Sequence, residues 1–208
     1  EPDNHVGLIG DYVWSGLFPE NKQNVPYSKA RYGHADYYAG DDEGFDTLVN
    51  WLGGEIPAGQ TQPRNLIVAH LAGLDSVGHR YGSDGSDYKE KLRWIDDHLV
   101  DVFAAVPEDW TVLVTSDHGL TDSGQHGSDS MQQREVAGFM WGPNIQPGVD
   151  VKDVNQVDIA TLPSVLLSLP MPHAIHGRIP LDAFNIDPEK RDALEQWNWN
   201  ATVARNDW

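Results

Sequence analysis

Residues 65–79 read NLIVAHLAGLDSVGH, and residues 110–119 read WTVLVTSDHG. Each stretch opens with a short apolar run, which is typical of a central strand buried on both faces. Between them, residues 87–106 carry apolar side chains at helical spacing and predict an amphipathic helix. Strand, helix and strand with short connections predict an α/β fold with a mostly parallel sheet flanked by helices.

Weaker patterns place further elements around these strands. Residues 5–14 indicate a buried strand that runs into a loop, and residues 136–141 indicate another strand. Helical spacing predicts helices over residues 43–52 and 156–169. Residues 185–208 have weak periodicity, and we expect them to form a C-terminal tail.

The composition is strongly acidic, with a formal net charge of −18 over 208 residues. Such a surface repels nucleic acid and anionic lipid, so neither is expected as a partner. The acidity fits a halophile surface or a merely solubilising one, and the sequence leaves both open. No apolar run reaches the roughly 18 residues that a membrane span needs. Because cysteine is absent, histidine and aspartate must hold any bound metal.

Acidic and imidazole side chains gather where two predicted strands end. Asp75 and His79 follow the first strand, which we expect to end at the residue before Asp75. Asp117 and His118 follow the second strand, and His126 lies eight residues further on, between glycines. In an open parallel sheet, ligands bind at the carboxyl ends of the strands, and carboxylate with imidazole suits Zn²⁺ or Mn²⁺. A lone residue of this kind is more often a solvated surface group or a helix cap, so the residue pattern by itself leaves both interpretations open.

The order of the motifs resembles the alkaline phosphatase superfamily: LDxxGH comes first, then SDHG, then the glycine-flanked His126. The most similar branch is the type I phosphodiesterase and nucleotide pyrophosphatase group, together with the ethanolamine-phosphate transferases of glycolipid anchor synthesis. Two further segments resemble those transferases, GDYVWSGLFP at 10–19 and QVDIATLPSVLLSLP at 156–170. The similarity extends over residues 8–184 and depends on the order of the motifs.

This resemblance implies a metal-dependent phosphoric ester hydrolase or phosphotransferase that acts on a phosphate-ester substrate. It also implies two divalent metal ions, with Zn²⁺ favoured over Mn²⁺. Asp75, His79 and His126 would hold one ion, and Asp117 and His118 would hold the second. Two neighbouring ions stabilise the charge that gathers on a phosphoryl group during in-line displacement. An extracytoplasmic location is favoured by the resemblance alone.

The sequence departs from the family pattern at its start. In the family, a metal-binding aspartate and a Ser or Thr nucleophile precede the GDxxW segment, whereas seven residues precede Leu8 here. Thr61, in GQTQP, has a similar local context at the wrong place in the order. We therefore expect residues 1–184 to form the C-terminal half of an alkaline phosphatase-like catalytic domain, inactive by itself. A second chain or a lost segment would supply the other half.

Two alternatives remain open. One is a non-catalytic module that binds metal or phosphate without turnover. The other is a phosphomutase of the same superfamily, which the short loops disfavour because a mutase carries an inserted domain for its sugar phosphate.

Overall fold

The computed structural model describes residues 6–10, 17, 36–56 and 65–206. The chain divides into two compact units, one of residues 1–107 with 118–136 and one of residues 108–117 with 137–208. Most of the predicted GDxxW and LFP segments, and also Thr61, lie outside the described residues.

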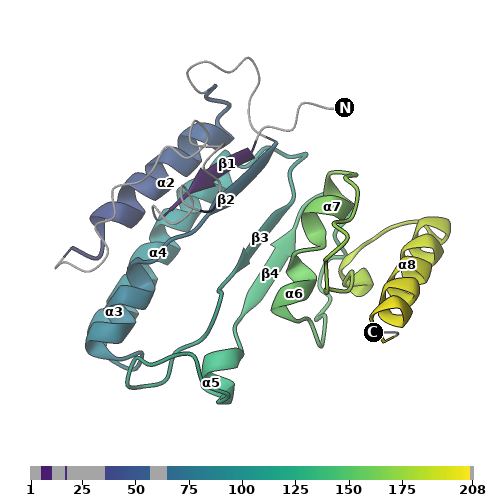
Figure 1. Cartoon of the computed structure of the whole chain (residues 1–208). Helices are drawn as coiled ribbons and strands as arrows, with labels where there is room; N and C mark the ends of the chain where they lie inside the picture. The colour runs from purple at the N-terminus through teal and green to yellow at the C-terminus, as the bar shows by residue number, and fades with distance from the viewer. Residues whose placement is uncertain (1–5, 11–16, 18–35, 57–64, 207–208) are drawn as a thin grey trace. The chain divides into compact units, whose positions relative to one another are not determined.

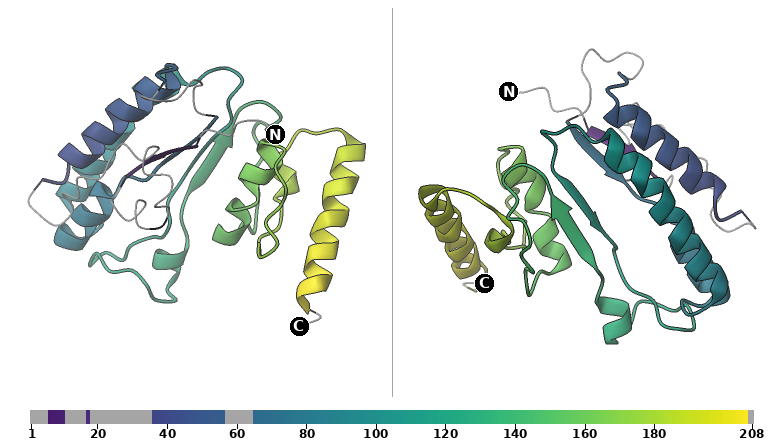
Figure 2. Two further views of the ribbon diagram at one scale, coloured as in Figure 1. Left: turned by 45° about the horizontal axis from the view of Figure 1, so that its top comes forward. Right: turned by 180° about the vertical axis from the view of Figure 1, so that it is seen from behind.

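The first unit has a parallel strand pair covered by helices. Its elements are β1 (Val6–Ile9), α2 (Ala39–Leu52), β2 (Leu66–Ala69), α3 (Gly73–Tyr81), α4 (Ser86–Ala105) and α5 (Met131–Arg134). β1 pairs with β2 in parallel, and Ile9 lies opposite Ala69. Helices α2 and α4 run side by side along this pair (Figures 1 and 2). Leu8 and Ile9 of β1 are buried, whereas β2 is half-buried and its last residue, Ala69, is exposed.

Helix α2 begins four residues before the predicted start of the helix at residue 43. The Asp36 carboxylate explains the earlier start, because its Oδ1 accepts the backbone N–H groups of Tyr38 and Ala39 at 3.1 and 2.9 Å. A side chain that satisfies the first free donors of a helix stabilises its N-terminus. The helix buries Phe45 and Trp51.

A buried ion pair joins α2 to α4. Lys91 Nζ lies 2.8 Å from Asp41 Oδ2, and both side chains are 0% exposed. The rings of Tyr38 and Trp94 enclose the ammonium, with their centroids 4.4 and 3.7 Å from Nζ. Burial lowers the pKa of Lys91, while the neighbouring Asp41 carboxylate acts in the opposite direction. We call these two residues the Asp41–Lys91 pair.

The second unit has an antiparallel strand pair and a separate apolar core. Its elements are β3 (Val112–Thr115), β4 (Gly138–Trp141), α6 (Gln156–Ile159), α7 (Leu162–Leu166), a 3₁₀ turn (Leu181–Ala183) and α8 (Pro188–Asn206). In the pair β3–β4, Val112 lies opposite Trp141 and Thr115 opposite Gly138. The buried core consists of Leu162, Ile179, Leu181, Ala183 and Phe184.

The segment that we expected to be a tail contains helix α8. Its Asn198 is buried and bonds to the backbone of Ile179 twice: it accepts the Ile179 N–H at 2.8 Å and donates to the Ile179 carbonyl at 2.9 Å. Trp197 packs against the apolar core of the unit. Leu194 packs there as well, so the helix docks through one buried amide and two apolar side chains, too few to give a clear apolar periodicity.

Two other expectations differ from the structure. The α/β content is present, but the mostly parallel sheet is not shown, because the described residues form one parallel and one antiparallel two-stranded sheet. The helix predicted over residues 156–169 is divided into α6 and α7, with Pro163 in the first turn of α7. Proline has no N–H to continue the helix of the preceding turn. None of the helices in the described part of the chain is long and apolar enough to cross a membrane.

We expect Lys91→Met to lower the free energy of unfolding by about 3–5 kcal/mol, because it leaves the buried Asp41 carboxylate beside a neutral side chain. The double variant Asp41→Asn/Lys91→Met should recover most of this loss, since it removes both charges. Urea unfolding followed by circular dichroism measures both effects.

Lys89→Met is the matched control, because Lys89 forms an exposed ion pair with Asp84 at 2.8 Å. Exposed pairs contribute roughly 0–1 kcal/mol. Equal losses at positions 89 and 91 would contradict the structural role of the Asp41–Lys91 pair.

Candidate metal centre

Asp75 and His79 lie on helix α3, whereas we expected them to follow directly on a strand that ends at Leu74; the strand β2 ends earlier, at Ala69. They are four residues apart, so both side chains project from one face of the helix. His79 Nε2 lies 3.4 Å from Asp75 Oδ2. The four-residue spacing of Asp75 and His79 is compatible with a helix. Gly73 and Gly78 are weak helix formers, however, so the sequence did not predict a helix here.

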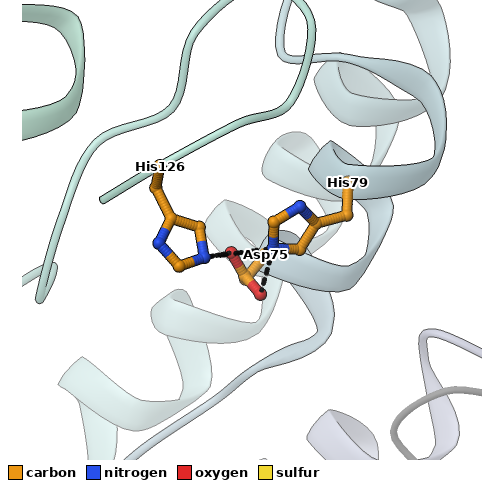
Figure 3. A group of neighbouring side chains, drawn as sticks. All are labelled: Asp75, His79 and His126. Carbon is orange, nitrogen blue, oxygen red and sulfur yellow. Dashed lines mark hydrogen bonds and ion pairs between the residues drawn. The ribbon is translucent and has the colours of Figure 1, made fainter. Parts of the chain in front are cut away.

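His126 joins these two side chains from a loop 47 residues further along the chain. Its Nε2 lies 3.1 Å from His79 Nε2 and 3.8 Å from Asp75 Oδ1. Figure 3 shows the two imidazoles and the carboxylate turned toward one another. One ligand atom from each residue lies within 4.8 Å of the others. The structure therefore brings together three of the five predicted ligands.

The His126 loop reaches α3 because glycines allow close backbone contact. Gly124 has φ +75°, and a Cβ there would lie 2.0 Å from the carbonyl oxygen of Gly78. Gly82, just after α3, has φ +79°, and its Cβ would lie 2.3 Å from the carbonyl oxygen of Asp122. Any side chain at either position would push the loop away from the helix.

A hydrogen-bonded turn fixes the loop immediately before His126. The Thr121 N–H donates to the Gln125 carbonyl at 3.0 Å, and Thr121 Oγ1 accepts the Gln125 N–H at 3.0 Å. The Gly124 N–H donates to the Thr121 carbonyl at 2.8 Å. Ser83 Oγ donates to the same carbonyl at 3.0 Å and ties the turn to the end of α3.

The three residues fit a divalent metal ion. Two donors that each lie about 2.0–2.1 Å from a tetrahedral Zn²⁺ are about 3.3 Å apart. The His79 Nε2 atom lies at a similar distance from two other donors, 3.1 Å from His126 Nε2 and 3.4 Å from Asp75 Oδ2. Asp75 Oδ1 is buried and has no hydrogen-bond partner among the described residues, and a buried polar atom of this kind calls for a partner or an ion. The three side chains are 34–41% exposed, which leaves room for a further ligand.

The other two predicted ligands are arranged differently. The His118 ring stacks on the His126 ring, with centroids 3.8 Å apart and an interplanar angle of 17°. Asp117 belongs to the second unit, where its backbone carbonyl accepts a hydrogen bond from Gln156 Nε2 at 2.9 Å. A second ion held by Asp117 and His118 therefore stays a prediction.

Sequence analysis missed Tyr88 on α4. Its ring lies 3.2 Å from the position of a Cβ at Gly78 and so packs against α3. Burial raises the pKa of the Tyr88 phenol, and the negative charge of Asp75 raises it further. The phenol is therefore neutral at physiological pH. No sequence motif marks this tyrosine, because its relation to Asp75 arises only when α3 packs on α4.

Comparisons with known proteins match most of the chain. The family described as type I phosphodiesterase / nucleotide pyrophosphatase matches residues 5–177. The catalytic subunit of GPI ethanolamine phosphate transferase 3 from Homo sapiens is 26% identical over 185 residues, which cover 86% of this chain and 16% of that protein. The GPI ethanolamine phosphate transferase 3 of Schizosaccharomyces pombe is 29% identical over 192 residues, which cover 88% of this chain and 20% of that protein.

A third relative is the GPI ethanolamine phosphate transferase 2 of Kluyveromyces lactis, which is 26% identical in an alignment 212 residues long; the alignment covers 91% of this chain and 26% of that protein. The chain thus spans between 16% and 26% of the length of these relatives. The resemblance to the alkaline phosphatase superfamily, and within it to the ethanolamine-phosphate transferase-like branch, is confirmed. The chain belongs to the type I phosphodiesterase / nucleotide pyrophosphatase family.

Proposed function

We propose that this chain supplies the metal-binding part of a phosphotransferase site that moves an ethanolamine phosphate group. The observation that carries the proposal is the convergence of Asp75, His79 and His126 within 4.8 Å, inside the stretch of residues 5–177 that matches the family. The relatives are named as ethanolamine phosphate transferases, which favours transfer of the group over its hydrolysis.

In the proposed site, Asp75, His79 and His126 hold one divalent ion, and Asp117 and His118 hold a second. Zn²⁺ suits these donors, and Mn²⁺ is the alternative. When bound, such ions polarise phosphoryl oxygens and stabilise the charge that develops on them. The protein keeps the donors in place: α3 fixes Asp75 and His79 one turn apart, and the His118 ring supports His126 by stacking at 3.8 Å.

We further propose that the attacking group comes from outside this chain, so that residues 1–184 act as the C-terminal half of a catalytic domain. The family pattern supports this, because its metal-binding aspartate and its nucleophile precede the GDxxW segment. The relatives are also several times longer than the stretch that they share with this chain. In-line attack needs a positioned nucleophile in addition to charge stabilisation.

We expect the purified chain to bind at least one Zn²⁺, measured by competition with a chromogenic chelator. His126→Ala should weaken binding by at least about 100-fold, since it removes a direct ligand and even outer partners of a metal site contribute 10–100-fold. His173→Ala is the control, because it removes an exposed imidazole of the second unit. Equal affinities of these two variants would contradict the assignment.

A p-nitrophenyl diester of ethanolamine phosphate tests the activity, because cleavage releases coloured nitrophenolate. We expect the 208-residue chain with Zn²⁺ to stay at background and the complete gene product that contains it to turn over. In the complete protein, His79→Ala should abolish release, and added glycerol should shift the product from free ethanolamine phosphate to its glycerol ester if the enzyme is a transferase.

Turnover by the isolated chain would overturn the external nucleophile, and Thr61→Ala would then show whether Thr61 attacks. Metal binding by a complete protein that has no turnover would instead support the non-catalytic module.

A further inference from the structure

The first residue of α3 contacts a carboxylate that is buried on another helix. The Gly73 N–H donates to Asp41 Oδ1 at 3.2 Å, across 32 residues of sequence. A Cβ at Gly73 would lie 2.2 Å from Asp41 Oδ2 and 2.4 Å from the carbonyl oxygen of Tyr37. The start of α3 is therefore in direct contact with Asp41, and there is no room for a side chain between them.

Asp41 is itself fixed from the opposite side. Its carboxylate is 0% exposed and lies 2.8 Å from the Lys91 ammonium, which is also 0% exposed. Tyr38 and Trp94 enclose that ammonium, so it cannot turn toward solvent. Asp41 is therefore held on α2 by a contact with α4 that does not involve α3.

The metal ligands follow this contact within two turns of one helix. At a rise of 1.5 Å per residue, Asp75 lies about 3 Å and His79 about 9 Å along the axis from Gly73. Metal–ligand distances tolerate deviations of about 0.2 Å, so a small displacement of the helix start disturbs both donors. A carboxylate near the first turn is also favoured by the helix dipole.

We propose that Asp41, held by Lys91, is a positioning residue for the metal centre: its carboxylate fixes the start of α3 and thereby the places of Asp75 and His79. This inference rests on the proposed metal-binding function. It differs from a purely structural role of the Asp41–Lys91 pair, because it requires that metal affinity depends on whether residue 41 can accept the Gly73 N–H.

Two double variants separate these roles. Asp41→Asn/Lys91→Met removes both charges but keeps an oxygen that can accept the Gly73 N–H, whereas Asp41→Leu/Lys91→Met removes the charges and the acceptor. We expect the Asn variant to bind Zn²⁺ within about threefold of the wild type and the Leu variant about 10-fold more weakly or worse, the size of an outer partner's effect. Cobalt absorption spectra would show the same difference as an altered ligand field at the centre.

Asp42→Leu is a matched control, because it places the same side chain one residue further along α2, where the Asp42 carboxylate is 60% exposed and faces His98. We expect wild-type zinc affinity for this variant. If the two double variants are equally folded by circular dichroism and bind Zn²⁺ equally well, the pair is only structural and the proposal fails.

Gly73→Ala is a second, independent variant in case Asp41→Leu/Lys91→Met does not fold. Its methyl group would displace the start of α3 from Asp41 without changing any charge, and we expect about 10-fold weaker Zn²⁺ binding. Gly53→Ala is its control, because a Cβ there meets backbone oxygens at 3.4 Å, an ordinary contact. Wild-type affinity in folded Gly73→Ala would overturn the positioning role and leave the proposed function intact. Absence of Zn²⁺ binding by the wild type would overturn both.

Discussion

The candidate site depends on a steric constraint, the close contact of two backbones where the His126 loop lies on α3. A Cβ at Gly124 would stand 2.0 Å from the carbonyl oxygen of Gly78, so the contact exists only because position 124 has no side chain. The ligands come from two segments 47 residues apart, and neither segment alone offers more than two of them. The packing of the two backbones therefore brings the donor side chains together, and contacts between these side chains contribute less to their convergence.

A buried ion pair lies at the start of the same helix, α3. The protein has 14 Lys and Arg residues against 32 Asp and Glu, yet Lys91 is fully buried. A buried ion pair adds little net stability compared with an apolar pair of the same shape, but it can specify one arrangement of the elements around it. The carboxylate partner, Asp41, contacts the first residue of the helix that carries Asp75 and His79. The burial of Lys91, one of only 14 basic residues, is consistent with our proposal that the Asp41–Lys91 pair fixes the position of α3.

Sequence reasoning succeeded where one local pattern decides the outcome. Helix α4 was predicted over residues 87–106 and is found at Ser86–Ala105, because its apolar spacing is regular. The ordered motifs also pointed to Asp75, His79 and His126; their side chains converge, and their binding of a metal ion stays a prediction. Helix α3 was not predicted because it contains two glycines, which are weak helix formers. The pairing of the strands was not predicted because an apolar run does not indicate which other strand it pairs with. The contact of Asp41 with Gly73 spans 32 residues and has no local signature at all.

The exposure of the ligands bears on the difference between transfer and hydrolysis. Asp75, His79 and His126 are 34–41% exposed, so water reaches the three ligands. A transferase must exclude water or hold its acceptor at a high effective concentration beside the phosphoryl group. The ligands that converge on α3 and the His126 loop could hold an ion that stabilises charge, but they do not exclude water. The relatives match this chain over 16–26% of their length, and the three converging ligands by themselves give no preference for an acceptor over water.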